Sequence, residues 1–391
     1  MGQQHAGVRR CPARHDAAAS VNAVRTRLTV VLLGLLLLAG AGVIRASGPT
    51  HSSTVVEPGV AGLARASAPT GSQTSSQASS QAGTRAANRC RGLQRAEIHG
   101  DEPTYTHKLL ALFDNHRRLC HGIWLPNPRR YLVPQGLAIA GRTAWLSGFR
   151  YRRGYGQRPC QLVRVDIVTG RRLAFHTAIF GRVGERPRTY CRHGGGIVQR
   201  GRQLWLVEKH KLWLVDPAQH SPVLNARRVW RIKAPVRGSA IVANSERIGL
   251  VPYQTRGVAR IYWFSLKRLL QPGVLDLALR HDGTTQLGPI GSTRIPRYVQ
   301  GATLDAGGRL YLSRSNLSCA ELVTPYGRRI AFMPGAEAIQ FASLGRRLWT
   351  VSESGAWPYA ISRKPLTPAL SSFEWPRLFR GKPAGCGFSA Y

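Results

Sequence analysis

Five positions that could take part in chemistry stand just before five copies of a short repeated phrase. They are Gln135, the segment 193–195 with His193, Arg237, Gln300 and Glu337. A carboxyl group beside an imidazole can transfer a proton, because histidine titrates near neutral pH. Amide and guanidinium groups can orient a ligand by hydrogen bonds. His193 and Glu337 are therefore candidate catalytic residues, and all five are candidate ligand-binding residues, provided that the fold brings them together.

The repeated phrase contains an alternating run, a turn that usually holds glycine, and an aromatic residue in a second alternating run. Copies begin at residues 136, 196, 238, 301 and 338, and the copy at 238 is degenerate. Alternation predicts a β-hairpin. Hairpins repeated at intervals of tens of residues are typical of a β-propeller, with one copy in each blade. We expect an all-β propeller of five or six blades over residues 130–391.

A propeller would gather the five polar positions at one mouth of its channel. The first strand of each blade lines the channel, so the residues that precede these strands converge. A convergent polar set can bind a ligand. It can also satisfy its own hydrogen bonds and plug the channel together with water.

Two other sets of side chains belong to the second strands of the hairpins. Glu208 and Glu353 end such strands, and we expect them near the opposite mouth, paired with arginines rather than acting in acid–base chemistry. The remaining set consists of large aromatic residues at one shared hairpin position, which predicts core between blades: Trp145, Trp205, Tyr311 and Trp349.

Four segments carry a resemblance to a known group of proteins: Pro134-Gln135-Gly136, His193–Ile197, Val299-Gln300-Gly301 and Leu348–Glu353. The chain resembles exported bacterial propeller proteins that are distantly similar to the NHL, gluconolactonase and strictosidine-synthase propellers. For the gluconolactonase type, the resemblance implies a divalent metal held in the channel by Glu, Asn and Asp. Glu337 stands at an equivalent strand start, but a matching Asn and Asp are not found. That departure counts against metal-dependent lactone hydrolysis.

Cysteine usage and the N-terminal segment both indicate export. Residues 28–44 form an apolar run that follows Arg25 and Arg27, which is typical of a signal peptide or a membrane anchor. Six cysteines follow the run, and an even number predicts disulfides in an oxidising, extracytoplasmic compartment. The simplest pairing is sequential: Cys90–Cys120, Cys160–Cys191 and Cys319–Cys386.

We divide the chain into four parts. Residues 1–46 are the signal or anchor, and residues 47–89, rich in Ser, Gln and Ala, form a disordered tether. Residues 90–129 lead into the propeller and contain a short helix within 104–118. Residues 130–391 form the propeller itself.

The net charge of +38 favours anionic partners, although an arginine-rich composition alone could also produce it. The loop 149–160 interleaves cations with aromatic residues, so Arg150, Arg152, Arg153 and Arg158 are candidates for contact with an anionic polymer or membrane headgroups. Nucleic acid is the disfavoured polyanion.

Three functions remain open. The first is a binding or scaffold module, tethered to the membrane if the N-terminal segment is retained, which uses the channel mouth and the basic loops. The second is a hydrolase or lyase of the lactonase-like propeller type, with a divalent metal at the mouth as its implied cofactor. The third is electrostatic binding of a polyanion. The residues do not decide whether the protein is an enzyme, and they do not name its ligand.

Overall fold

The computed structural model describes residues 90–105, 113–126, 132–151, 159–342, 346–360 and 369–388. The chain divides into two units, Met1–Gln77 and Ala78–Tyr391, and every described residue belongs to the second. The apolar run at 28–44 and the tether at 47–89 lie outside the described residues. No helix within the described ranges is long and apolar enough to cross a membrane.

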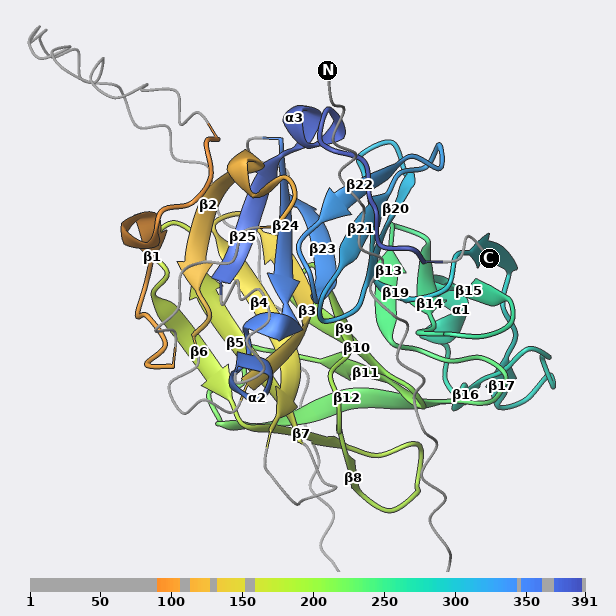
Figure 1. Cartoon of the computed structure of the whole chain (residues 1–391). Helices are drawn as coiled ribbons and strands as arrows, with labels where there is room; N and C mark the ends of the chain where they lie inside the picture. The colour runs from red at the N-terminus through yellow and green to blue at the C-terminus, as the bar shows by residue number, and fades with distance from the viewer. Residues whose placement is uncertain are drawn as a thin grey trace, which may run out of the picture. The chain divides into compact units, whose positions relative to one another are not determined.

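Three of the sheets contain four antiparallel strands each (Figure 1). The first consists of β3 (Leu132–Ala140), β4 (Thr143–Arg150), β5 (Cys160–Asp166) and β6 (Arg172–His176). The second consists of β13 (Ala240–Ala243), β14 (Arg247–Val251), β15 (Ala259–Ser265) and β18 (Gly291–Ile295). The third consists of β19 (Val299–Leu304), β20 (Leu310–Ser315), β21 (Ala320–Val323) and β22 (Arg329–Phe332).

Two larger sheets complete the set. One has the order β1 (Ile98–His99), β2 (Leu119–Trp124), β25 (Ala369–Glu374), β24 (Arg347–Ser352) and β23 (Ala336–Ala342). Strands from both ends of the propeller meet there, because β2 pairs with β25. The eight-stranded sheet contains β9 (Gly196–Arg200), β10 (Gln203–Glu208), β11 (Lys211–Val215), β12 (Val223–Ile232), β16 (Asp276–Leu277), β17 (Gln286–Leu287), β7 (Ala178–Gly181) and β8 (Thr189–Tyr190).

The first strands of the sheets form a closed ring, which makes the fold an all-β propeller. β3 contacts β9, β9 contacts β13, β13 contacts β19, β19 contacts β23, and β23 returns to β3. Closure removes the exposed sheet edges along the channel. Hydrophobic clusters lie between neighbouring sheets, and they include the four aromatic positions that the sequence assigns to the core: Trp145, Trp205, Tyr311 and Trp349.

The size of the sheets differs from that of the regular blades that the sequence predicts. Across the described ranges, four sheets are compact, with four or five strands, and the fifth is extended to eight. The reason is that strands from two long intervals add to β12 of this sheet: β16 and β17, which follow β15, and β7 and β8, which follow β6. A long interval between repeats therefore adds strands to an adjacent blade.

Helical structure is sparse. The α-helices are α1 (Leu266–Leu269), α2 (Trp357–Ala360) and α3 (Trp375–Phe379), and the 3-10 turns are η1 (Arg95–Glu97), η2 (His116–Arg118) and η3 (Glu353–Gly355). The helix expected within 104–118 falls largely on residues 106–112, which lie outside the described set, and His116–Arg118 is a 3-10 turn.

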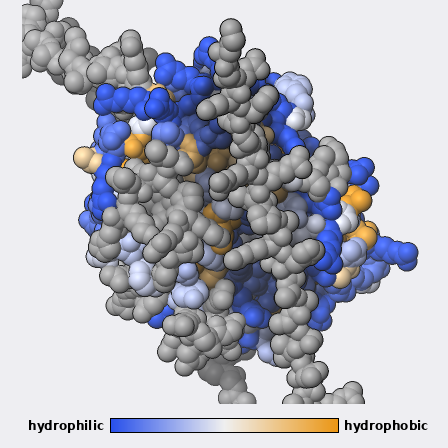
Figure 2. All heavy atoms as spheres, viewed as in Figure 1, coloured by the Kyte–Doolittle hydropathy of each residue, from blue (hydrophilic) through white to orange (hydrophobic). Residues whose placement is uncertain are grey.

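The six cysteines form the three disulfides of the sequential pairing, so the disulfide prediction is confirmed. The bonds are Cys90–Cys120, Cys160–Cys191 and Cys319–Cys386. Such bonds persist in oxidising compartments, which favours an extracytoplasmic location. On the face drawn in Figure 2, hydrophilic residues predominate where described atoms are visible, and hydrophobic residues appear as small separate patches.

Candidate functional site

A bulge recurs at the same position in the strands that line the channel. The pairing register shifts between Pro134 and Gly136, between Val299 and Gly301, and between Ala336 and Ala338. The residues skipped by these shifts are Gln135, Gln300 and Glu337. A bulged residue is left out of the ladder and its side chain is re-aimed, so three of the five predicted positions share one structural role.

The same arrangement continues in the other two channel strands. The backbone N–H of Gly195 donates to the carbonyl group of Val207, which is the residue that pairs with Gly196. In the same way, the N–H of Ser239 donates to the carbonyl group of Val251, which pairs with Ala240. The position equivalent to Gln135 is therefore Ser239 in the β13 hairpin. Arg237, the residue predicted from the sequence, stands two residues earlier. The error arises because Gly238 resembles the glycine of the repeat, although Ala240 occupies that place.

Small residues let the channel strands approach one another at this end. A Cβ atom added to Gly136 would lie 2.9 Å from the backbone nitrogen of Ile197, and one added to Gly301 would lie 2.9 Å from the carbonyl oxygen of Glu337. Neither glycine could carry a side chain without moving a neighbouring strand. The close approach brings the bulged positions of adjacent sheets together.

A buried glutamate and a half-buried one, both from one hairpin, lie at the centre of the site. β23 and β24 are antiparallel and Ala336 pairs with Ser352, so Glu353, which follows β24, lies beside Glu337. The side chain of Glu337 is buried, with the residue only 3% exposed, and the two carboxyl groups are hydrogen bonded to each other. Burial, and then the charge of Glu353, raises the pKa of Glu337 well above its ordinary value.

Glu353 is the acceptor of the pair. Burial raises its pKa, while hydrogen bonds from Glu337 and Gln135 work in the opposite direction. The shared proton therefore resides on Glu337, because two adjacent buried carboxyl groups cannot both ionise without a large cost. Oε1 of Glu337 is buried and has no hydrogen-bond partner among the described residues. An unpartnered buried oxygen is available to a ligand or to water.

A hydrogen-bonded chain extends from the glutamates to a histidine in a third sheet. Gln135 Nε2 donates to Glu353 Oε2 at 3.0 Å, and Gln135 Oε1 lies 2.9 Å from His193 Nε2. An amide oxygen can only accept, so His193 Nε2 carries a proton in this arrangement. The imidazole stacks on Phe149, with ring centroids 4.9 Å apart. The chain links Glu337, Glu353, Gln135 and His193 at one mouth.

An exposed tyrosine lies near the carboxyl pair. Tyr253 is 43% exposed, and its pKa is raised by burial and then by the charges of Glu337, Tyr298 and Glu353. Its ring lies 6.4 Å from that of Tyr298. Tyr298 has a φ of +63° and stacks on Phe388 at 5.1 Å. The mouth therefore combines acidic groups with aromatic ones.

The repeat contains a signal that could have identified Tyr253, which was not predicted, and the correct mouth for Glu353. In each hairpin, the small residue after the bulge pairs with a residue of the second strand. Two positions beyond that partner stand Phe149, Tyr253 and Glu353 in their respective hairpins. The second strand of a hairpin runs back toward the start of the first, so its end lies at the same mouth. The prediction that Glu353 lies at the opposite mouth is therefore wrong.

Glu208 also lies at this end of its hairpin, but it has a structural environment. Its carboxylate accepts from the backbone N–H of Arg192 and from Trp213 Nε1, and it pairs with Lys211. An ion pair with a cation was expected, and the cation is a lysine rather than an arginine. Within the described ranges, no hydrogen bond joins Glu208 to Glu353.

Arg237 and Gln300 do not join the hydrogen-bonded chain as the structure describes it, and most of the predicted basic loop lies outside the described residues. Arg237 donates to the carbonyl oxygen of Val236 at 3.2 Å. Gln300 is half-buried, and no hydrogen bond joins it to the other candidates in the described part of the chain. Arg150 ends β4. The other arginines of its loop lie outside the described residues: Arg152, Arg153 and Arg158.

The residues at the mouth do not fit a resident divalent metal ion. The two carboxyl groups are hydrogen bonded to each other, and Gln135 presents an N–H rather than an oxygen to them. Among the described residues, one cluster of three has metal-ligand spacing: Cys160, Cys191 and Glu208. Its cysteines form a disulfide and offer no thiolate.

The channel continues to a cavity of 310 Å³ at the other ends of the five inner strands. Its polar lining comes from the side chains Gln199, Arg200, Thr303 and Gln340. None of these belongs to the hydrogen-bonded chain at the mouth, so the cavity and the carboxyl pair are separate features of the channel.

No known protein family model and no curated protein matches the chain. Among solved structures, it is similar to a calcium-binding protein, regucalcin, from Agrobacterium tumefaciens, with 13% identity over 62% of this chain and 90% of that one and a TM-score of 0.36. It is also similar to the PQQ-bound aldose sugar dehydrogenase of Streptomyces coelicolor, with 13% identity over 62% and 94% and a TM-score of 0.36.

A third solved structure, a luciferin-regenerating enzyme, shares 7% identity over 68% of this chain and 96% of that one, with a TM-score of 0.33. At these identities, the likenesses concern the fold alone. The propeller assignment itself stands on the closed ring of inner strands, and the ligand or reaction must be argued from the mouth.

Proposed function

We propose that the protein is an extracytoplasmic binding module whose ligand docks at the channel mouth, against Glu337, Glu353, Gln135 and His193. The observation that carries the proposal is the hydrogen-bonded chain through these four side chains, which come from three different sheets. Ligand sites commonly combine a preformed hollow with a few convergent polar groups. The buried and unpartnered Glu337 Oε1 supports a ligand contact at this point.

The chemistry of the mouth favours a ligand with an organic cation. Two carboxyl groups that share one proton can release it when a positive charge takes its place. Tyr253 supplies an exposed aromatic ring nearby, and aromatic faces attract ammonium groups. The site would thus select an amine in a protein whose surface is otherwise strongly basic. Because binding expels a proton, affinity should increase as the pH rises.

A thermal-shift titration with putrescine, tetramethylammonium and calcium chloride, at pH 5 and pH 8, tests this proposal. We expect the amines to raise Tm more at pH 8, and the rise to disappear in Glu337→Gln and Glu353→Gln. Glu246→Gln, which removes an exposed carboxylate from a distant hairpin turn, is the matched control and should behave as wild type. Equal shifts in all four proteins would overturn the proposal, and a rise with calcium alone would replace it with a metal site.

A hydrolase or lyase is the second candidate, and the raised pKa of Glu337 favours it. A carboxylic acid with a raised pKa beside an acceptor carboxylate is a common acid–base arrangement. Turnover of a lactone or glycoside panel that depends on Glu337, with a bell-shaped pH profile, would support catalysis. Absence of turnover together with amine binding would leave the binding module.

The proposal includes the segments that precede the propeller. Residues 1–46 would direct export or remain as an anchor, and residues 47–89 would form a tether. Fractionation of cells that express the full chain separates the two cases. Anchored protein stays with the membrane after a carbonate wash, whereas cleaved protein is released and starts near residue 46.

A further inference from the structure

A second hollow lies on the outside of the eight-stranded sheet, away from the channel. β12 pairs in parallel with β7 at Val223–Asn225 and with β16 at Arg231–Ile232. Between these two pairings, the outer edge of β12 has no strand partner within the described residues. Figure 1 shows β7 and β12 running side by side, with the loop to β8 beyond them. A cavity of 740 Å³ opens along this stretch.

Arginines dominate the wall of this cavity, which we call the arginine groove. It is lined by the side chains Arg182, Arg188, Asn225, Arg227, Arg228 and Leu275, together with Val229 and small residues. The β7–β8 loop closes one side, since a Cβ atom on Gly184 would lie 3.2 Å from Leu275. Glu185, the loop's carboxylate, is not part of the lining.

Two arginines of the groove have no acidic partner among the described residues. Arg182 is exposed and takes part in no hydrogen bond or ion pair there. Arg188 donates to the neutral Asn225 Oδ1 at 3.0 Å, and its guanidinium lies 4.4 Å from the centre of the Phe180 ring. These contacts orient the guanidinium without neutralising it. An oriented, uncompensated guanidinium is prepared to bind an anion.

The other two arginines of the groove are engaged. Arg227 forms an ion pair with Asp216. Arg228 donates to three backbone carbonyl groups, those of Leu270, Gln271 and Val274. Burial lowers the pKa of Arg228. No carboxylate among the described residues neutralises Arg228, so it adds positive potential behind the exposed arginines.

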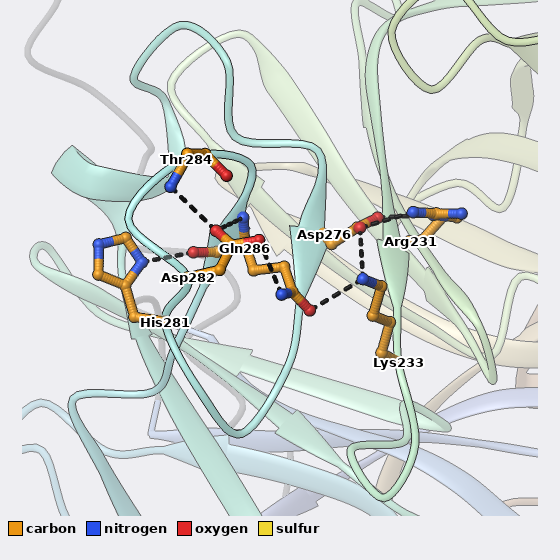
Figure 3. A network of polar contacts seen from close by, with 7 residues as sticks. All are labelled: Arg231, Lys233, Asp276, His281, Asp282, Thr284 and Gln286. Carbon is orange, nitrogen blue, oxygen red and sulfur yellow. Dashed lines mark hydrogen bonds and ion pairs between the residues drawn. The ribbon is translucent and has the colours of Figure 1, made fainter.

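At the far end of β12, by contrast, the cations have an acidic partner, as Figure 3 shows. Arg231 and Lys233 both pair with Asp276, at 2.6 Å and 2.9 Å. Lys233 also donates to Gln286, which belongs to the hydrogen-bonded loop around Asp282. Burial would raise the pKa of Asp276, but the two cations outweigh it and lower the pKa. Within the groove, by contrast, only Arg227 of the four arginines has an acidic partner among the described residues.

We propose that the arginine groove binds an acidic polysaccharide. Guanidinium groups match carboxylate and sulfate oxygens in paired hydrogen bonds. Leu275, which is half-buried, supplies apolar surface against which a sugar ring can pack. Nucleic acid fits less well, because its bases need open aromatic faces, and the Phe180 face is covered by Arg188. An extracytoplasmic protein also meets acidic glycans in its surroundings.

The test measures binding of fluorescent polygalacturonate to the full chain between 50 and 300 mM salt. We expect Arg182→Gln/Arg188→Gln to lower affinity at least tenfold at low salt. The slope of log K against log salt concentration should also become shallower, by roughly one for each lost contact. Arg172→Gln/Arg260→Gln is the matched control. It removes the same charge from β6 and β15, where Arg172 also lies over a phenylalanine and Arg260 also donates to a neutral side chain.

Three results would overturn the proposal. Equal weakening by both double variants would mean that only net charge matters. Tighter, groove-dependent binding of single-stranded DNA would assign the groove to nucleic acid, and binding of inorganic phosphate without polymer binding would make it a small-anion site. Arg182→Gln alone removes no internal contact, so it should fold as wild type and show part of the loss. Glu337→Gln should leave polymer binding unchanged, which separates this proposal from that for the mouth.

Discussion

At the scale of single residues, the ionisation of Glu337 decides how the mouth behaves. Its carboxyl group is buried beside Glu353 and holds the shared proton. The position of Glu337 could be predicted from the repeat, because a residue before a channel strand must face the mouth. The raised pKa of Glu337 could not be predicted, because Glu353 was expected at the opposite mouth of the channel. Burial and partnership are properties of the folded chain.

Replacing Glu337 with Gln should stabilise the protein at neutral and alkaline pH. The pKa of Glu337 is higher in the folded chain than its ordinary value of 4.5. Its contribution to stability is therefore full below about pH 4.5 and is lost as the pH rises toward the folded pKa. Gln stays neutral and avoids that loss. A tenfold difference in proton affinity is worth about 1.4 kcal/mol, or roughly 2–4 °C in Tm.

Thermal unfolding of both proteins between pH 4 and pH 8 measures this effect. We expect equal Tm values near pH 4 and a growing advantage for Glu337→Gln above pH 5. A constant difference across the range would mean that Glu337 ionises as it does in the unfolded chain. Glu246→Gln, at an exposed turn, should follow wild type throughout.

At the scale of elements, a hairpin with a bulge is the unit that builds the site. The hairpins and their core aromatic residues could be predicted, since alternation and turn glycines are local signals. The bulges could not, because they arise where adjacent channel strands meet. Without the bulges, the copy of the repeat at residue 238 was aligned two residues too early. For that reason Arg237 was predicted at the position that Ser239 occupies. The carry-over of strands β16 and β17 into the neighbouring sheet is likewise a non-local event.

Gly335 positions Glu353 through the backbone, and its replacement should disrupt the mouth. The carbonyl group of Gly335 accepts from the N–H of Glu353 at 2.9 Å. Its φ is +69°, and a Cβ atom there would lie 2.0 Å from Ser354 Oγ. We expect Gly335→Ala to combine left-handed strain of roughly 1–2 kcal/mol with displacement of the turn that carries Glu353. Both stability and amine binding should fall.

The matched control is Gly327→Ala, at a turn with a φ of +77° and no atom within 4 Å of the added Cβ. It carries the same backbone strain without the clash. Chemical denaturation and the amine titration should show a similar loss of stability from strain, but unchanged ligand binding. If Gly327→Ala abolished binding as well, the turn at Gly335 would have no special part in the site.

At the scale of the whole molecule, strands and disulfides near both ends of the propeller hold the ring closed. β2 and β25 share a sheet, and Cys319–Cys386 fixes the C-terminal segment across the third sheet. Ala331 donates to Lys382, and Phe388 lies over Arg314, whose buried ion pair with Glu321 it covers. The even cysteine count made these bonds predictable. The sequence did not predict that Cys319–Cys386 also supports the mouth, where Phe388 of the C-terminal segment stacks on Tyr298.

Replacing Cys319 and Cys386 with Ser should therefore loosen the C-terminal segment and weaken the mouth. The bond closes a loop of 67 residues, for which chain entropy predicts about 4 kcal/mol of stabilisation. The control is Cys90→Ser/Cys120→Ser, which removes the disulfide that closes a shorter loop of 30 residues. Hydrogen exchange should rise at residues 382–388 only in the first variant, together with weaker amine binding. If exchange there stayed slow, the contacts of Lys382 and Phe388 would hold the segment without the bond, and mouth and tail would be independent.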